Sequence, residues 1–339
     1  MQMFLRQFPY YIAEIAQAHE GSLGILHSYI DAVAKTGAHA IKFQLHIAEA
    51  ESSEAETFRT KFSYEDATRF DYWKRMEFTF EQWQGIKAHV EGVGLDFIVS
   101  PFSVAAVKML EKLGLTAYKI GSGELSNLLM LEAIAKTGTP VILSSGMSDF
   151  TELDTAVSLF KSRNTPLAML QCTTAYPTKP IEYGFNVLAE MKSRYQIPIG
   201  FSDHSAKSST GIAAVALGAE ILEFHVVFDK ELFGPDAKAS LTFPEVKQLI
   251  DGANDVYEAL QNPVVKNHTA DFNSLKTLFG KSLAVNRDLE QGAVIQESDL
   301  ESKKPANCGI PAADYKQVIG KKLLRPLKQW DFLTENDIA

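Results

Sequence analysis

Short apolar runs alternate along the chain with longer segments in which apolar positions recur every three or four residues. The short runs have the length of buried parallel strands, and the longer segments are typical of amphipathic helices. The pattern predicts strands at residues 10–15, 40–44, 96–99, 117–120, 141–143, 167–170, 199–201 and 221–224. It predicts helices at residues 23–35, 79–92, 104–113, 128–137, 152–163, 186–195, 206–218 and 243–260.

Strand followed by helix, repeated eight times in about 250 residues, has the size and rhythm of a (β/α)8 TIM barrel. A doubly wound sheet is the alternative, but it usually has fewer strands, and no glycine-rich dinucleotide fingerprint follows the first strand. Residues 45–74 are too many for a plain strand-to-helix connection, so we expect them to be partly ordered over the active-site face.

The periodic pattern ends after residue 261, which predicts a barrel domain of residues 1–261. Residues 262–274 contain Pro263 and several asparagines and are expected to form a linker. Residues 275–339 differ, because short Val, Ile and Leu runs stand between turns, as at 282–285, 294–295 and 322–324. A unit of roughly 60 residues is small for independent stability, so we expect it to pack on something else.

Charge and composition narrow the classes of partner. The 339 residues carry a net charge of −9 with a pI near 5.5, which argues against nucleic acid or an anionic membrane as the main partner. No apolar run approaches transmembrane length, and the first residues lack the features of a signal peptide. Cys172 and Cys308 are far apart, which fits a reducing compartment, so we expect a cytoplasmic protein.

Polar residues accumulate where the expected strands end, and in a barrel these ends meet at the catalytic face. Two lysines with serines and glycines are typical of a cradle for phosphate and carboxylate groups. Each residue taken singly also fits an ordinary polar group at the start of a loop. The set comprises Glu14, Lys42, Gln44, Ser100, Lys119, Ser122, Glu124, Ser144, Ser145, Gly146, Thr173, Thr174, Tyr176, Ser202, Asp203, His204 and His225.

Two of these residues, His204 and His225, each follow an apolar run, and we expect both just past the ends of adjacent strands. Neutral imidazoles on adjacent strand ends are one way to build a metal site. The alternative is a pair of hydrogen-bonded histidines near strand ends. Asp236, in the loop after the last strand, either binds a polyol or caps a turn.

Ten short motifs occur in one order along the chain: IAEI from residue 12, HEG from 19, KFQ from 42, SPF from 100, YKIGSGE from 118, SSGM from 144, QCTTAYP from 171, FSDH from 201, LEFH from 222 and GPD from 234. In this order they resemble the sialic acid (N-acetylneuraminate) synthase family. The resemblance extends to the C-terminus, where the segment after residue 275 is similar to the antifreeze-like (SAF) domain that closes these synthases.

The resemblance implies a metal-dependent transferase that condenses phosphoenolpyruvate with N-acetylmannosamine by C–O cleavage, giving N-acetylneuraminate and phosphate. It implies that His204 and His225 bind a divalent metal, Mn²⁺ or Mg²⁺ with Co²⁺ as a third choice, which polarises the sugar aldehyde. Glu14 would orient a sugar hydroxyl or manage the proton of the attacking water. The expected phosphoenolpyruvate site is Lys42, Gln44, Ser100, Lys119, Ser122, Ser144, Ser145, Gly146, Thr174 and Ser202. The expected sugar site is Glu14, Tyr176, Asp203, Asp236 and Lys304.

Four positions depart from the family pattern: Ser100 replaces a threonine, Thr174 an asparagine, Lys304 an arginine, and Phe224, just before His225, another arginine. In the family the arginine at the position of Lys304 reaches into the partner subunit's sugar site, so the resemblance implies a domain-swapped homodimer. Lys304 keeps the charge but loses the two-pronged donor geometry, which leaves the acyl-group preference open.

Other functions fit parts of the pattern. Within the family, the alternative is a synthase making legionaminic or pseudaminic acid from a diacetamido-dideoxy hexose. A metal-dependent aldolase or hydrolase on the same barrel would need neither both lysines nor the serines. A carbohydrate-binding or ice-binding protein built on the C-terminal unit would leave the polar strand ends unexplained.

Overall fold

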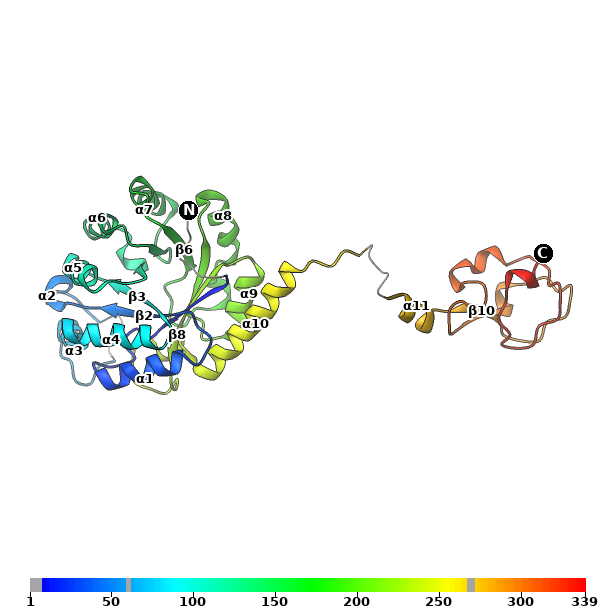
Figure 1. Cartoon of the computed structure of the whole chain (residues 1–339), viewed down its shortest axis with the longest axis horizontal. Coiled ribbons are helices and arrows are strands. Elements are labelled where there is room, and N and C mark those ends of the chain that lie inside the picture. Colours follow the sequence, from blue (N-terminus) through cyan, green and yellow to red (C-terminus); the bar gives the residue numbers. More distant parts are fainter. Residues whose placement is uncertain (1–7, 59–61, 267–271) are drawn as a thin grey trace. The chain divides into compact units, whose positions relative to one another are not determined.

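The computed structural model of the chain describes residues 8–58, 62–266 and 272–339 and divides the chain into two units, Met1–Asn262 and Pro263–Ala339. The described part of the first unit is a closed barrel of eight parallel strands surrounded by helices (Figure 1), which confirms the predicted fold. Strand β1 pairs with both β2 and β8, and this closes the ring. The strands are β1 (Tyr10–Glu14), β2 (Ala40–Leu45), β3 (Asp96–Pro101), β4 (Ala117–Ile120), β5 (Val141–Ser144), β6 (Leu167–Cys172), β7 (Ile199–Asp203) and β8 (Ile221–Val227).

Each predicted helix is present, with ends shifted by at most a few residues. Helix α4 (Phe80–Gly92) begins with a capping box, because the Thr79 hydroxyl accepts from the Gln82 N–H while the Gln82 side chain accepts from the Thr79 N–H. The helices are α1 (Leu23–Val33), α4 (Phe80–Gly92), α5 (Val104–Leu113), α6 (Leu128–Thr137), α7 (Phe150–Ser162), α8 (Phe185–Tyr195), α9 (Ser208–Ala216) and α10 (Phe243–Gln261).

Side chains of the barrel strands alternate between two cores. Residues such as Tyr11, Phe43 and Tyr118 face the helices, whereas Tyr10, Ile98 and others fill the barrel interior. Every second residue of a strand faces the interior. These interior positions hold apolar residues near the strand starts and polar residues near the strand ends. The interior therefore ends in a polar layer at the carboxyl ends of the strands.

Strand β8 differs from the prediction in one respect. It continues through His225 to Val227, so the expectation that this histidine lies past the strand was wrong. The register explains the extension, because His225 pairs with Glu14 of β1, and Val226 and Val227 go on to pair with β9 (Leu241–Thr242). His225 is thus held by a paired strand rather than by a loop.

The long segment after β2 is ordered over most of its length, as predicted, with residues 59–61 outside the described part. It contains α2 (Ala48–Glu51) and α3 (Arg69–Met76). The guanidinium of Arg75 donates to Asp66 at 2.7 Å and to Glu20 at 3.1 Å, which ties the segment to the loop after β1.

The second unit has its own small core, formed by Leu283, Leu323, Leu333 and neighbouring apolar residues. The predicted strand 282–285 is β10 (Ser282–Val285), which pairs antiparallel with β11 (Leu300–Lys303). Residues in 294–295 and 322–324 form isolated bridges instead of strands. The predicted linker, 262–274, lies partly outside the described residues, and α11 (Asn273–Phe279) begins within it.

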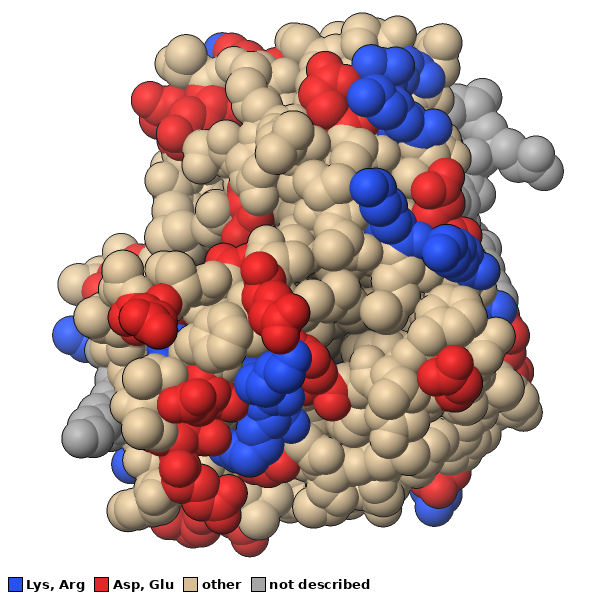
Figure 2. Space-filling view, turned by 90° about the vertical axis from the view of Figure 1, so that its left-hand side faces the viewer, with Lys and Arg blue, Asp and Glu red and all other residues tan. Residues whose placement is uncertain are grey.

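On the face shown in Figure 2, acidic and basic side chains are interspersed around a hollow. Among the helices in the described ranges, none combines the length and the apolar character needed to cross a bilayer.

Candidate active site

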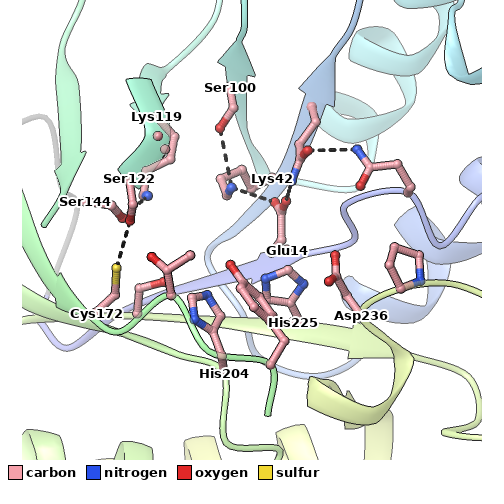
Figure 3. Close-up of a pocket in the computed structure, with 18 of the residues that line it drawn as sticks. Glu14, Lys42, Ser100, Lys119, Ser122, Ser144, Cys172, His204, His225 and Asp236 are labelled. Atoms are coloured by element: carbon pink, nitrogen blue, oxygen red, sulfur yellow. Dashed lines mark hydrogen bonds and ion pairs between the residues drawn. The ribbon is translucent and has the colours of Figure 1, made fainter. Parts of the chain in front are cut away.

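A pocket of about 300 Å³ lies at the carboxyl ends of the barrel strands (Figure 3). Most of the residues that the sequence assigned to the two substrates line it. These are Glu14, Lys42, Gln44, Ser100, Lys119, Ser122, Ser144, Thr174, Tyr176, Ser202, His204, His225 and Asp236. The strand ends therefore converge on one cavity, as expected from a barrel.

One half of the pocket is a buried ionic network on β1, β2, β4 and β8. Lys42 Nζ lies 3.0 Å from Glu14 Oε2 and 3.7 Å from Glu223 Oε1. Lys119 Nζ lies 3.5 Å from the same Glu223 oxygen. We call these four residues the ionic quartet. Each is at most 5% exposed, so their charges are balanced by one another and only weakly by solvent.

The quartet sets the protonation of its members. Burial alone would lower the pKa of Lys42, but Glu14 and Glu223 outweigh it and raise that pKa. Burial opposes ionisation of Glu223, yet the two ammonium groups lower its pKa. Burial lowers the pKa of Lys119, and Glu223 works against that shift. Glu223 thus remains a carboxylate between two ammonium groups.

Hydroxyl groups surround the two lysines. Lys119 Nζ donates to Ser144 Oγ at 2.5 Å, and Lys42 Nζ donates to Ser100 Oγ at 3.4 Å. The Ser122 hydroxyl accepts from the Gly146 N–H at 3.1 Å. Ammonium, hydroxyl and amide donors in one buried space form a site for a phosphate or carboxylate group.

The other half contains the two histidines. His204 Nδ1 lies 2.9 Å from the Thr173 carbonyl, which can only accept, so Nδ1 carries the proton and Nε2 carries a lone pair. Burial, followed by the neighbouring His225, lowers the pKa of His204 to about 3, which keeps the ring neutral. The two imidazole centroids are 5.2 Å apart, and the Tyr176 ring stacks on His204 at 4.2 Å.

This half fits a divalent cation by its donor chemistry. A neutral imidazole whose Nδ1 is bonded to a carbonyl is oriented to ligate through Nε2. In the described ranges no group of three or more His, Cys, Asp or Glu side chains is arranged to hold a metal. A cation here would therefore rely on two protein ligands and fill its other positions with water or substrate.

Four predicted site residues do not line the pocket. Ser145 donates to Gln171 at 3.0 Å, and Gly146 contributes only its N–H. Asp203 follows the inward-facing Ser202 on β7, so alternation turns it away from the interior, and its carboxylate accepts from the N–H and hydroxyl of Ser205. Lys304 is in the second unit, where its Nζ lies 5.0 Å from the centre of the Phe279 ring.

Asp236 does line the pocket, at the start of the short 3-10 turn Ala237–Ala239. Its side chain makes no capping hydrogen bond to that turn. Its position in the pocket is compatible with the binding role.

Several pocket residues escaped the sequence interpretation. Glu223 is the most important, and the period of two would have identified it, because it precedes His225 by two residues on the same face of β8. Other lining residues come from loops and from α3, where no strand pattern points to them. They include Gln17, Phe62, Arg69, Trp73, Phe102 and Pro235, whereas Cys172, which was also missed, is the last residue of β6.

Comparison with known proteins gives consistent matches. Residues 29–265 match the NeuB family, and residues 280–339 match the SAF domain. The chain is 31% identical over 328 residues to the N-acetylneuraminate-9-phosphate synthase of Homo sapiens, covering 96% of this chain and 91% of that protein. It is 30% identical over 330 residues to the N,N'-diacetyllegionaminic acid synthase of Campylobacter jejuni, covering 96% and 98%.

A solved structure extends the likeness to three dimensions. The N-acetylneuraminic acid (sialic acid) synthetase from Leptospira borgpetersenii, crystallised with citrate, superposes with a TM-score of 0.69 at 30% identity. The match covers 79% of this chain and 90% of that one.

Proposed function

This chain belongs to the NeuB family, and we propose that it condenses phosphoenolpyruvate with N-acetylmannosamine, giving N-acetylneuraminate and phosphate. The coarser class, a synthase that makes a nonulosonic acid, is common to the named relatives. The observation that carries the proposal is the pairing of a lysine–serine cradle with two histidines in one pocket. Aldolases and hydrolases have no need of the cradle.

Phosphoenolpyruvate fits the ionic half. Lys119, with Ser144 beside it, and Lys42, with Ser100 beside it, present ammonium and hydroxyl donors to a phosphate and a carboxylate. Both lysines are already oriented in the free protein by Glu14 and Glu223, so little side-chain entropy is lost on binding.

Charge balance supports a metal requirement. The two ammonium groups and two carboxylates of the ionic quartet sum to zero, so the negative charge of phosphoenolpyruvate enters a buried site without net compensation. A divalent cation such as Mn²⁺ or Mg²⁺ at His204 and His225 would restore the balance. When bound, such an ion supplies Lewis-acid polarisation of the acceptor's aldehyde oxygen.

Glu14 stands between the two halves. Its Oε2 is buried and lies 3.0 Å from its ion-pair partner Lys42 Nζ, which occupies one lone pair of this oxygen and leaves the other. This oxygen is available to accept a proton or a hydrogen bond from a sugar hydroxyl or from the water that adds to phosphoenolpyruvate.

The acceptor sugar would occupy the outer end of the pocket, near Tyr176, Asp236 and Arg69. A second candidate acceptor is a diacetamido-dideoxy hexose, because the relatives named as legionaminic and pseudaminic acid synthases are as similar to this chain as the human enzyme. We further propose that the active form is a domain-swapped homodimer in which Lys304 enters the partner's sugar site.

The test is release of inorganic phosphate from phosphoenolpyruvate with a panel of acceptors: N-acetylmannosamine, its 6-phosphate and diacetamido-dideoxy hexoses. We expect turnover with at least one acceptor, loss of turnover in chelator and recovery with Mn²⁺. Metal-dependent turnover with none of them would refute the function. For the dimer, mixing His204→Ala chains with Lys304→Ala chains should restore activity in the hybrid, and a fully active monomer by light scattering would refute it.

A further inference from the structure

A chain of side-chain hydrogen bonds runs beneath the pocket from a buried acid to Glu14. Glu51 Oε1 lies 2.5 Å from His46 Nδ1, and His46 Nε2 lies 2.9 Å from Gln17 Nε2. The same Gln17 nitrogen lies 2.8 Å from Gln44 Oε1. Gln44 Nε2 then donates to Glu14 Oε1 at 2.7 Å. We call Glu51, His46, Gln17, Gln44 and Glu14 the relay.

The donors and acceptors of the relay can be assigned in only one way. The Glu51 carboxylate can only accept, so His46 Nδ1 donates and Nε2 carries a lone pair. That lone pair accepts from one N–H of Gln17, whose other N–H goes to Gln44 Oε1. The Gln44 amide is thereby oriented with its NH₂ toward Glu14. Gln44 Oε1 and His46 Nε2 are both acceptors and lie 3.3 Å apart. They can lie so close because the Gln17 amide nitrogen donates one N–H to each of them.

Aromatic packing fixes the His46 ring. It lies between Trp73 at 3.9 Å and Phe102 at 4.5 Å, nearly parallel to both. The Arg69 guanidinium continues the stack, 4.1 Å from the centre of the Trp73 ring. His46 is 4% exposed and does not line the pocket, whereas Arg69, Trp73 and Phe102 do. The imidazole therefore touches substrate at no point but supports residues that line the pocket.

We propose that His46 is a positioning residue that acts on the reaction through Gln17 and Gln44. It holds the Gln44 NH₂ on Glu14 Oε1, so the carboxylate keeps one orientation, with Oε2 against Lys42 Nζ and its second lone pair left for the reacting groups. This catalytic consequence rests on the proposed function. If His46 gained a proton at Nε2, or lost the acceptor there, the Gln17 amide would be free to turn over, and Gln44 would lose the donor that orients it.

Two substitutions of similar size separate this role from packing. Asparagine reaches as far as Nδ1 and keeps a donor for Glu51, whereas glutamine reaches as far as Nε2 and keeps an acceptor for Gln17. Both remove the ring from the aromatic stack, so we expect similar losses of Tm. We expect His46→Asn to lower kcat about tenfold and His46→Gln to stay within about threefold of wild type. KM for phosphoenolpyruvate should hardly change, because the contacts of Lys119 lie outside the relay.

Gln17→Met removes both N–H donors and provides a second, independent break. We expect it to lower kcat by about as much as His46→Asn, and the double variant to be no worse than either single one. Equal loss of kcat in His46→Asn and His46→Gln, or additive losses in the double variant, would overturn the proposal.

A measurement without turnover separates this proposal from the function itself. In ¹⁵N-histidine-labelled protein near neutral pH, we expect the His46 resonances, identified by their absence in His46→Asn, to show the neutral Nδ1–H tautomer. An Nε2–H tautomer or an imidazolium would refute the relay even if the enzyme is active. A wild-type chain that shows the Nδ1–H tautomer but releases no phosphate with any acceptor would refute the function and leave the relay supported.

Discussion

The two halves of the pocket are prepared for their ligands in opposite ways. In the ionic half, each charge of the quartet has a counter-charge within 3.7 Å, and both lysines already donate to serine hydroxyls. In the histidine half, the His204 ring is neutral, and its Nε2 carries a lone pair. The first half is complete before binding, whereas the second is completed only by a ligand.

This difference indicates how the halves depend on each other. A balanced ionic network is costly to break, because removal of one member leaves a buried charge. Removing an imidazole from the other half takes away no member of that network and should cost less stability. Substitutions in the two halves should therefore separate stability from activity, and the predictions below test that separation.

The largest effect is expected in the histidine half. His204→Ala and His225→Ala should each lower kcat about a thousandfold or more while the unfolding midpoint changes little, since each removes a proposed metal ligand and no counter-charge. Steady-state kinetics and thermal denaturation measure the two quantities. His89→Ala, a histidine on α4 outside the pocket, is the control and should keep near-normal kcat. Near-normal activity in both pocket variants would remove the metal assignment.

In the ionic half, stability should fall together with binding. Lys119→Met leaves Glu223 short of one counter-charge, so we expect a loss of about 3 kcal/mol in the free energy of unfolding and a rise of about a hundredfold in KM for phosphoenolpyruvate. Adding Glu223→Gln removes the stranded charge and should recover most of the stability but not the KM. If the double variant recovered neither, the quartet would not be an electrostatic unit.

The halves should also be coupled through charge. Because the quartet is neutral overall, phosphoenolpyruvate should bind about fiftyfold more tightly with Mn²⁺ than in chelator, and Mn²⁺ should bind more tightly by the same factor with phosphoenolpyruvate. Isothermal titration of each ligand with and without the other measures both factors. Equal affinities would show that the cation does not offset the substrate's charge.

The smallest effect concerns the cradle's shape. A Cβ at Gly146 would lie 2.5 Å from the hydroxyl oxygens of Ser122 and Thr174, so Gly146→Ala must displace both. We expect KM for phosphoenolpyruvate to rise about tenfold with little change in kcat. Gly123→Ala is the matched control, because its Cβ would meet only Met147 at 3.5 Å. Indistinguishable kinetics for the two variants would contradict this description of the cradle.

The sequence was sufficient for the barrel and for most of the pocket. Period and length predicted every barrel strand, and the motif order predicted the family, which the NeuB match confirms. Errors arose where residues were assigned by proximity to a strand end. Side chains alternate between the two faces of a strand, so Asp203 on β7 points away from the interior and Glu223 on β8 points into it. Applying this alternation to the sequence would have removed Asp203 from the expected site and added Glu223.

Other parts of the structure depend on tertiary contacts that the pattern of apolar and polar residues does not reveal. Trp73 and Arg69 reach the pocket from α3 because Arg75 ties that segment to Glu20 and Asp66, and no local rule reveals this clamp. In the second unit, β11 was missed because its sequence, LESK, carries little apolar character. Residues joined only by long-range contacts remain the hardest to find from one sequence.

Strand β8 fixes the spacing between two pocket residues. Glu223 and His225 are two residues apart on one face, which along a strand is about 6.6 Å. Under the proposed function, Glu223 would serve the phosphate end and His225 the aldehyde end, so backbone pairing along β8 would fix the spacing between the two substrates. Substitutions in the loops around the pocket could then change the acceptor while this spacing stays the same.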